Sequence, residues 1–143
     1  LDIPRTILDY AGVEPLDFMD GKSLKPLVYG ETKSWRSKLF LESLYTGRDN
    51  PFQEGIRIGK WKYIRMYDGV EPYDEQSVDF SNREPEFEML FDLDADPGET
   101  QNRIEEMGDT QFLEDLRQKT ANYSVALNEQ RETYKEAVTT QTR

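Results

Sequence analysis

Apolar residues recur at helical spacing near both ends of the chain. Over Ile3–Gly12 they fall on one side of a short helix, with Pro4 near its start and glycine just past its end, so a helix is predicted there. A second stripe of helical period begins at Asp109, which is available as the N-cap, and runs to about Tyr134. The segment Ala137–Arg143 has too little apolar surface to pack and is expected to fray.

Between these helices, apolar and polar residues alternate over short segments, as they do in strands. Leu39–Leu44 has apolar residues of both parities, so a strand with both faces covered is predicted. Ile56–Met66 alternates around Gly59, which is typical of a hairpin with a tight turn at this glycine. Glu88–Leu93 is the last predicted strand, and it ends in the turn Asp94–Gly98.

Polar segments separate these elements and are predicted to be loops. Tyr45–Glu54 contains glycine, aspartate, asparagine and proline, each of which favours turns. Asp68–Pro85 is polar and acidic and is interrupted by proline, so a long surface excursion is expected. Asp17–Gly30 is expected to be irregular, with one helical turn around Leu24–Tyr29. Strands in hairpin order followed by a long helix predict an α+β fold, a small antiparallel β-sheet of about four strands packed against a long C-terminal α-helix.

The composition of the chain excludes several classes of function. The chain has 143 residues and a formal net charge of −11, so it repels nucleic acid, anionic lipid and sulfated sugars alike, and no nucleic-acid partner is expected. No apolar run approaches the roughly 20 residues of a membrane span. With no Cys and no His, the chain lacks the commonest nucleophile–base pairs and the imidazole and thiolate metal ligands. It is therefore expected not to catalyse a reaction alone.

Alternating aspartates after the last predicted strand suggest one metal site. Asp92, Asp94 and Asp96 have the spacing of the first ligands of a calcium-binding loop. However, Pro97 stands where such a loop needs glycine, and Arg103 stands where it needs glutamate. An acidic turn at the end of a strand is the favoured interpretation, and no metal ligand is assigned.

Two further clusters have a functional and a structural interpretation. The dense basic cluster consists of Arg57, Lys60, Lys62 and Arg65. It could hold an anion, but pairing with the abundant carboxylates is favoured. The aromatic cluster consists of Trp35, Tyr45, Trp61 and Tyr63. It could stack on sugar rings, but aromatic residues at strand spacing more often belong to a core.

Several short segments also carry a family pattern, in one order along the chain. They are Asp2–Val13, with Arg5 inserted into the family's proline–threonine step, Asp20–Leu24, Trp35–Arg36 with Leu39–Glu42, Arg57–Ile64, and Leu90–Leu93 with Asp96–Glu99 and Asn102. In this order they resemble the C-terminal part of the sulfatase family, formylglycine-dependent sulfuric ester hydrolases of the alkaline-phosphatase-like superfamily. The resemblance runs from Leu1 to about Asn102, and the final helix is compatible with it.

The resemblance implies a parent enzyme that hydrolyses sulfate esters with a formylglycine, made from Cys or Ser in a C/S-x-P-x-R motif, beside a calcium ion. No proline of this chain has Cys or Ser two residues before it and Arg two residues after it. The resemblance thus implies that the nucleophile, the metal ligands and the sulfate-binding residues belong to a larger N-terminal domain. No catalytic residue, metal ligand or cofactor is carried onto this chain, which alone is expected to be inactive.

The resemblance also implies a domain organisation and a partner. Residues 1–30 correspond to the tail end of the N-terminal catalytic domain, a helix plus linker, and residues 31–143 to the C-terminal subdomain. The helix Ile3–Gly12 is then expected to pack loosely on this chain. The partner is the N-terminal catalytic domain of the same protein, and the substrate is a sulfated carbohydrate or another sulfate ester.

The segment Tyr45–Glu54 corresponds by position to a family loop that leans over the active-site cleft. Its candidate substrate-binding residues are Arg48, Asp49, Asn50 and Gln53. Many family members have a histidine in this region, and this chain has none, so their substrate cannot be transferred to it.

The start of the chain, Leu1–Pro4, has neither an initiator Met nor a signal pattern, so the sequence is expected to begin in mid-protein. By resemblance, the parent is expected to be an exported bacterial protein, periplasmic or secreted. Two alternatives remain open at this point. One is a non-catalytic acidic binding or assembly module, and the other is the C-terminal part of a related phosphodiesterase or phosphonate hydrolase.

Overall fold

The structure, a computed structural model, describes residues 1–17, 19–33, 35–44, 51–67, 79–80 and 83–141. The chain divides into two compact units, Leu1–Ser37 and Lys38–Arg143. The first unit contains helices α1 (Asp2–Ala11) and α2 (Lys25–Val28). Both confirm predicted helical segments.

Polar contacts, more than burial, hold the first unit together. The Asp2 carboxylate accepts hydrogen bonds from Arg36 at 2.6 and 2.9 Å and from the Lys22 amide at 2.9 Å. The Arg36 guanidinium consequently holds the pKa of Asp2 below its ordinary value. Gly12 caps the C-terminus of helix α1, and its φ of 68° lets its N–H close the last turn. The helix buries none of its residues, and Ile7 is 62% exposed.

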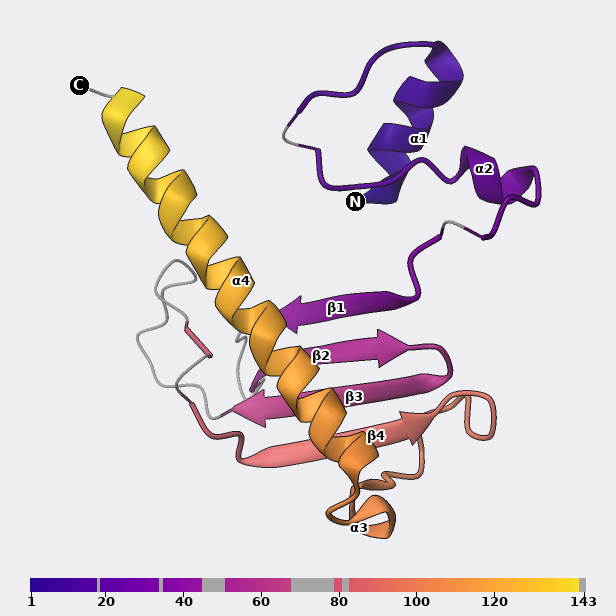
Figure 1. The fold of residues 1–143 in the computed structure, drawn as a ribbon, viewed down its shortest axis with the longest axis vertical. Helices are drawn as coiled ribbons and strands as arrows, with labels where there is room; N and C mark the ends of the chain where they lie inside the picture. Colours follow the sequence, from indigo (N-terminus) through magenta and orange to yellow (C-terminus); the bar gives the residue numbers. More distant parts are fainter. Residues whose placement is uncertain (18, 34, 45–50, 68–78, 81–82, 142–143) are drawn as a thin grey trace. The chain divides into compact units, whose positions relative to one another are not determined.

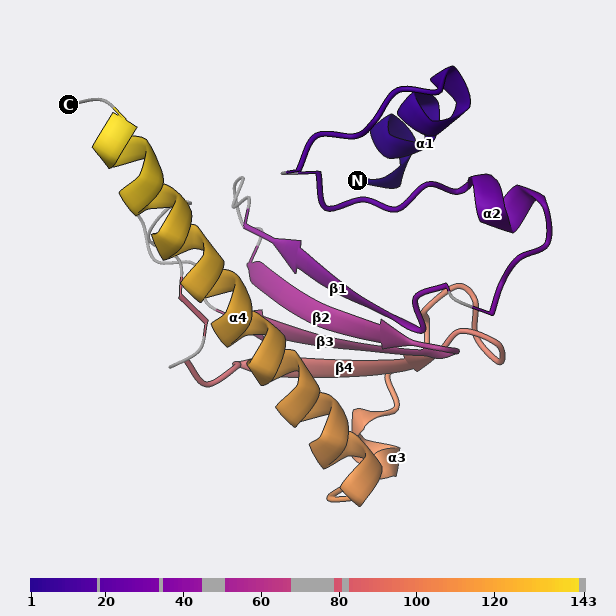
Figure 2. The same cartoon turned by 45° about the horizontal axis from the view of Figure 1, so that its top comes forward.

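The second unit is one sheet with a long helix, and it confirms the predicted α+β fold class. Its elements are β1 (Lys38–Ser43), β2 (Phe52–Ile58), β3 (Trp61–Tyr67), β4 (Phe87–Asp92), α3 (Ile104–Met107) and α4 (Gln111–Gln141). The four strands are antiparallel, and their order in the sheet is their order in the chain. Helix α4 crosses one face of the sheet, as Figures 1 and 2 show.

The predicted hairpin is confirmed, and its turn sets the register of the sheet. Ile58 pairs with Trp61 across the two turn residues, of which Gly59 has a φ of 56°, the left-handed region that hairpin turns of this length require. The register places Ile56 beside Tyr63. Because successive side chains point to opposite faces, alternate residues of each strand face α4, and the apolar ones among them form a layer beneath the helix.

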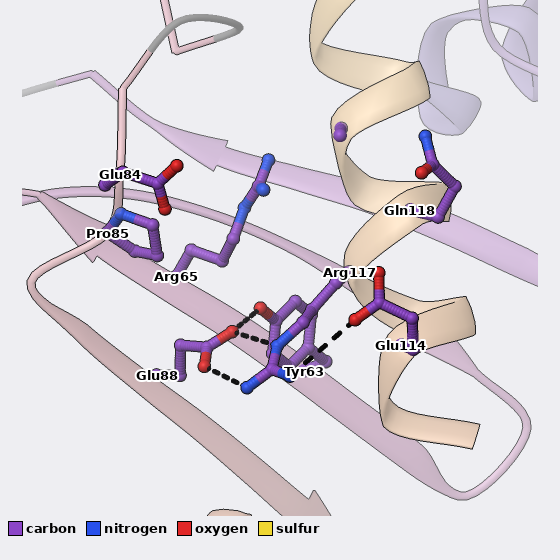
Figure 3. A pocket seen from close by; sticks show the side chains of 9 residues that line it. Tyr63, Arg65, Glu84, Pro85, Glu88, Glu114, Arg117 and Gln118 are labelled. Carbon is purple, nitrogen blue, oxygen red and sulfur yellow. Dashed lines mark hydrogen bonds and ion pairs between the residues drawn. The ribbon is translucent and has the colours of Figure 1, made fainter. Parts of the chain in front are cut away.

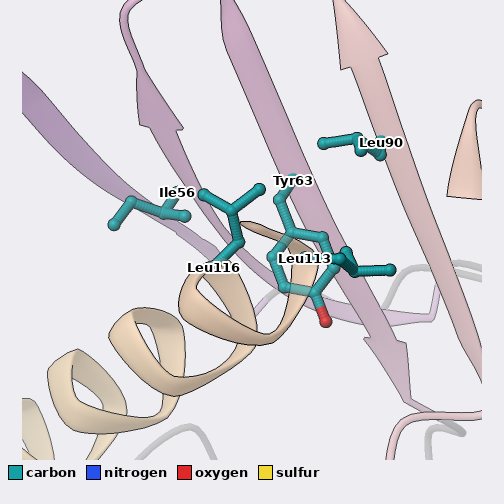
Figure 4. Packing of buried hydrophobic residues seen from close by; sticks show 5 residues of the cluster. All are labelled: Ile56, Tyr63, Leu90, Leu113 and Leu116. Atoms are coloured by element: carbon teal, nitrogen blue, oxygen red, sulfur yellow. The ribbon is translucent and has the colours of Figure 1, made fainter. Parts of the chain in front are cut away.

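The core lies in that layer. Ile56, Tyr63 and Leu90 from the sheet meet Leu113 and Leu116 from α4, each no more than 2% exposed, as Figure 4 shows. Aromatic pairs extend the contact toward both ends of the helix: Phe40 stacks on Tyr123, with ring centroids 5.5 Å apart, and Trp61 packs on Phe112 at 5.3 Å.

Two expectations about the strands were wrong. Strand β1 is covered on one face only, because Leu39 and Leu41 point away from α4 and are each 40% exposed. Strand β2 begins at Phe52, so the end of the predicted loop Tyr45–Glu54 belongs to the sheet. The physical reason is that Phe52 and Glu54 are buried on the α4 side, at 2% and 1% exposure.

The predicted excursion Asp68–Pro85 contains one buried aromatic residue, Phe80, which its polar composition did not indicate. Phe80 is 1% exposed, stacks on Tyr67 with ring centroids 4.7 Å apart and meets Phe52 at 6.0 Å. These three residues form a second apolar cluster. Residues 68–78 and 81–82 of the excursion lie outside the described residues.

Both ends of α4 differ from expectation. Thr110, not Asp109, is the N-cap, because its hydroxyl accepts from the Leu113 amide at 3.3 Å and its carbonyl accepts from Glu114 at 3.1 Å. The helix continues to Gln141, through most of the segment that was expected to fray. Helical hydrogen bonding propagates from the packed turns at one bond for each residue added.

Candidate functional site

Two of the segments that carry the family pattern, Arg57–Ile64 and Leu90–Leu93 with Asp96–Glu99, form one corner of the fold. Lys60, in the hairpin turn, pairs with Asp92 at the end of β4 at 2.6 Å, and Lys62 pairs with Glu99 at 2.6 Å. The Leu93 amide also donates to the Lys60 carbonyl at 2.8 Å. The pairing predicted for the basic cluster is therefore confirmed at these lysines, and this corner stabilises the sheet.

The aspartates of the acidic turn are also occupied by internal donors. Asp92 accepts from Lys60 and from the amides of Asp94 and Ala95, and these bonds hold its pKa below the ordinary value. The amides of Gln101 and Thr100, at 2.8 and 2.7 Å, hold the pKa of Asp96 low in the same way. Because these oxygens already accept hydrogen bonds, they do not fit a calcium site. Within the described ranges, no three acidic residues gather as a metal cluster.

A polar pocket of about 460 Å³ opens between α4 and the β3–β4 edge (Figure 3). It is lined by Tyr63, Arg65, Glu84, Pro85, Glu88, Glu114, Arg117, Gln118 and Ala121. At its centre, Arg117 of α4 donates two hydrogen bonds, of 2.6 and 2.9 Å, to the carboxylate of Glu88 of β4. The Tyr63 hydroxyl donates to the same carboxylate.

The electrostatics of this group oppose acid–base chemistry. The bidentate bond from Arg117 holds the pKa of Glu88 below its ordinary value, so the carboxylate stays ionised at neutral pH. Burial, reinforced by the hydrogen bond to Glu88, raises the pKa of Tyr63, so the phenol stays protonated. Neither group can exchange a proton readily near neutral pH. The group fixes α4 to the sheet and does not form a catalytic pair.

Sequence reasoning missed a buried ion pair on the same side of the sheet. Glu54 has a fully buried side chain and accepts hydrogen bonds from Arg65 and, at 2.6 Å, from the Tyr67 hydroxyl. Burial and this carboxylate raise the pKa of Tyr67. The available signal was parity, since Glu54 shares its strand face with Ile56 and therefore points toward the core.

Of the four candidate substrate-binding residues, the structure places one. Gln53 is half-buried in β2, on the face opposite α4, where it lines a hollow of about 170 Å³. Arg48, Asp49 and Asn50 lie outside the described residues.

The core interpretation of the aromatic cluster is confirmed for Tyr63 and Trp61. Tyr63 is in the core and Trp61 packs against it, while the guanidinium of Arg36 lies 4.8 Å from the ring centroid of Trp35. Tyr45 lies outside the described residues. In the part of the chain that the structure covers, no helix is long and apolar enough to cross a membrane.

Curated relatives of this chain are named as sulfatases. An N-acetylglucosamine-6-O-sulfatase of Bacteroides thetaiotaomicron is 32% identical over 71% of this chain and 16% of its own length. A choline-sulfatase of Rhizobium meliloti is 33% identical over 73% of this chain and 17% of its own length. Arylsulfatase A of Bos taurus is 33% identical over 73% of this chain and 22% of its own length. The chain thus matches only about a fifth of each relative or less.

Solved structures share the fold. A 2-O GAG sulfatase has a TM-score of 0.62 at 22% identity, over 95% of this chain and 26% of that one. A protein solved in complex with its substrate D-glucosamine-2-N,6-O-disulfate has a TM-score of 0.58 at 24% identity, over 92% of this chain and 24% of that one. Residues 1–126 match the family described as N-sulphoglucosamine sulphohydrolase, C-terminal. The chain therefore belongs to this family and is a sulfatase C-terminal subdomain.

Proposed function

We propose that this chain is the C-terminal part of an enzyme that hydrolyses sulfate esters, in which it completes the fold and shapes the substrate cleft. The observation that carries the proposal is the family match over residues 1–126, which spans both units of the chain. The names of the three curated relatives support a sulfuric ester hydrolase.

The chemistry of the chain's own residues supports a division of labour. The chain has no Cys and no His. The carboxylates of Glu54, Glu88, Asp92 and Asp96 are held by internal donors. Neither formylglycine nor calcium fits these residues, so both are assigned to the rest of the protein. We expect the 143-residue chain alone to hydrolyse no sulfate ester.

Substrate selection is proposed for the connection between β1 and β2. Arg48, Asp49 and Asn50 lie in that connection, and Gln53 follows it in β2. Arginine and asparagine side chains can donate to the hydroxyl and sulfate oxygens of a sugar. One relative is named N-acetylglucosamine-6-O-sulfatase, and one similar structure was solved with its substrate D-glucosamine-2-N,6-O-disulfate. Both support a sulfated carbohydrate as the substrate class.

The test is the hydrolysis of aryl sulfate and of sulfated glucosamines by the intact protein. Arg48→Gln and Asn50→Ala are expected to lower kcat/KM for the sugar by about 10- to 100-fold, the range for the loss of a charge-assisted contact, without changing the melting temperature. Lys119→Gln is the matched control, because Lys119 is exposed on α4, outside both the β1–β2 connection and the sheet. It should leave kcat/KM unchanged.

Three outcomes would contradict the proposal. Faster turnover of phosphodiesters than of sulfate esters by the intact protein would favour the phosphodiesterase alternative. No hydrolysis of either class would favour a non-catalytic module. An unchanged sugar kcat/KM in both loop variants would remove the substrate role from the β1–β2 connection.

A further inference from the structure

The sheet has a second apolar face that no described helix of its unit covers. The strand register places alternate residues on the side opposite α4, which we call the open face. Its apolar members are Leu39, Leu41, Ile64, Met66, Phe87, Met89 and Phe91. Phe91 is already buried within the unit, at 6% exposure. Leu39 and Leu41 are 40% exposed and Phe87 is 52% exposed. Apolar side chains of β1, β3 and β4 therefore lie on this face, and β2 contributes Gln53, Gly55 and Arg57 between them.

A hollow lies in the open face where β2 lacks a side chain. Gly55 pairs with Leu41 on one side and with Ile64 on the other. These two apolar residues line the space of about 170 Å³ together with Glu42, Ser43, Gln53, Glu54 and Lys62. A Cβ built on Gly55 would lie 2.4 Å from the Tyr63 carbonyl oxygen, closer than real atoms approach. Close strand packing thus forbids a side chain there and preserves the hollow.

An apolar surface of this extent is unusual on a free domain, because sheets bury both faces when both are apolar. The family is defined as a C-terminal region, and the chain spans 16 to 22% of its curated relatives. A large remainder of the same protein is thus the available cover. A second copy is disfavoured, because pairing would bring together two chains of net charge −11.

We propose that the N-terminal part of the same protein packs on the open face, and that one of its apolar side chains inserts into the hollow above Gly55. The inference rests on the proposed function, since it takes this chain to be one part of a larger sulfatase. It adds to that function the surface through which the two parts join. Leu41, Gly55 and Ile64 lie side by side on three neighbouring strands. The inserted side chain would occupy the space above Gly55, between Leu41 and Ile64.

The test is the rate of thiol labelling at single introduced cysteines in the intact protein. Leu41→Cys probes the open face and Val125→Cys, on α4, is the matched control, because the native residues are 40% and 43% exposed in this chain. Iodoacetamide labelling is followed by mass spectrometry of the peptide, so other cysteines of the protein do not interfere. We expect Leu41→Cys to react at least ~10-fold more slowly than Val125→Cys in the native protein, and equally fast in guanidinium, because burial restricts access of the reagent.

Equal labelling of the two native variants would overturn the docking proposal. Protection that disappears on dilution would also overturn it and would assign the open face to a second copy. The insertion is tested by adding Ser43→Trp to Leu41→Cys, because a ring placed in the hollow competes with the inserted side chain. Labelling should then rise several-fold, whereas Thr100→Trp, an exposed control, should leave it unchanged. No rise with Ser43→Trp would overturn the insertion.

The labelling result does not depend on catalysis. An intact protein that hydrolyses sulfate esters but leaves Leu41→Cys unprotected would contradict the docking proposal alone. A protected Leu41→Cys in a protein without sulfatase activity would contradict the proposed function alone.

Discussion

At the scale of single residues, the family motifs of this chain act in folding. Asn102 illustrates this, since its side chain behaves as an additional strand partner for β4. Its Oδ1 accepts from the amides of Leu90 at 2.9 Å and Ile104 at 3.1 Å, and its Nδ2 donates to the Glu88 carbonyl at 3.0 Å. An edge that would otherwise expose free backbone groups is thereby satisfied.

Replacing this side chain should destabilise the fold. We expect Asn102→Ala to lower the free energy of unfolding by about 2 kcal/mol, because it leaves backbone groups without partners. Urea unfolding followed by circular dichroism measures the loss, and amide exchange should accelerate at Leu90. Asn122→Ala is the control, since Asn122 is exposed on α4, where its Oδ1 accepts a hydrogen bond from Gln118. An equal loss in both variants would contradict the strand-partner role.

The Arg117–Glu88 pair predicts a pH-dependent effect. Because the pKa of Glu88 is lowered from 4.5, the pair stabilises the fold above this value and loses its contribution as the pH falls through the lower, folded-state pKa. Arg117→Gln should therefore cost about 1–2 kcal/mol at pH 7, a typical value for a bidentate pair that is only partly exposed.

This cost should shrink steadily below pH 4.5, as measured by urea unfolding at a series of pH values. Lys119→Gln is the control, because its pair with Asp115 is exposed and 3.8 Å long. A cost for Arg117→Gln that is constant down to pH 3 would contradict the assignment.

At the scale of elements, α4 is the only described helix whose residues belong to the buried core cluster. The helix begins at Gln111, and its core residues Leu113 and Leu116 lie within its first two turns. The cap that fixes this start therefore also fixes the part of the helix that packs on the sheet. Two neighbouring residues could cap that turn, and the structure assigns the cap to Thr110.

The cap assignment gives a direct comparison of two variants. Thr110→Ala should lower the free energy of unfolding by about 1 kcal/mol, the usual cost of losing an N-cap hydroxyl. Asp109→Ala should cost less than half of this, because only a weak interaction with the helix dipole is lost. Thermal unfolding of the two variants measures both values, and a larger cost for Asp109→Ala would restore the cap predicted from sequence.

Strand and helix positions could be predicted because alternation and helical period report burial directly. Gly59 and the alternating residues around it were sufficient for the hairpin and its register. The burial of Phe80 could not be predicted, since its partners Tyr67 and Phe52 are brought to it only by the folded sheet. Of the candidate site, Gln53 was expected in a loop, because its burial depends on pairing with Ser43 and Met66, which no local pattern encodes.

At the scale of the whole molecule, the two units differ in what stabilises them. Both buried apolar clusters lie within Lys38–Arg143. Leu1–Ser37 contains one buried residue among those described, Gly21.

Removing residues 1–37 should therefore leave the sheet and α4 folded. We expect the urea midpoint of residues 38–143 to lie within ~0.3 M of that of the full chain, because the midpoint follows the buried core. Circular dichroism and tyrosine fluorescence measure both transitions. A midpoint lower by 1 M or more, or a loss of cooperativity, would show that the first unit stabilises the second.

The meander order of the strands has a consequence for biosynthesis. Each strand pairs with the strand made just before it, so the sheet needs only local pairing as it leaves the ribosome. Helix α4 is made after all four strands, however, and until then Ile56, Tyr63 and Leu90 have no cover. A nascent chain that pauses before residue 111 therefore exposes the apolar residues of a preformed sheet. During this interval the chain is most prone to aggregate and most in need of chaperones.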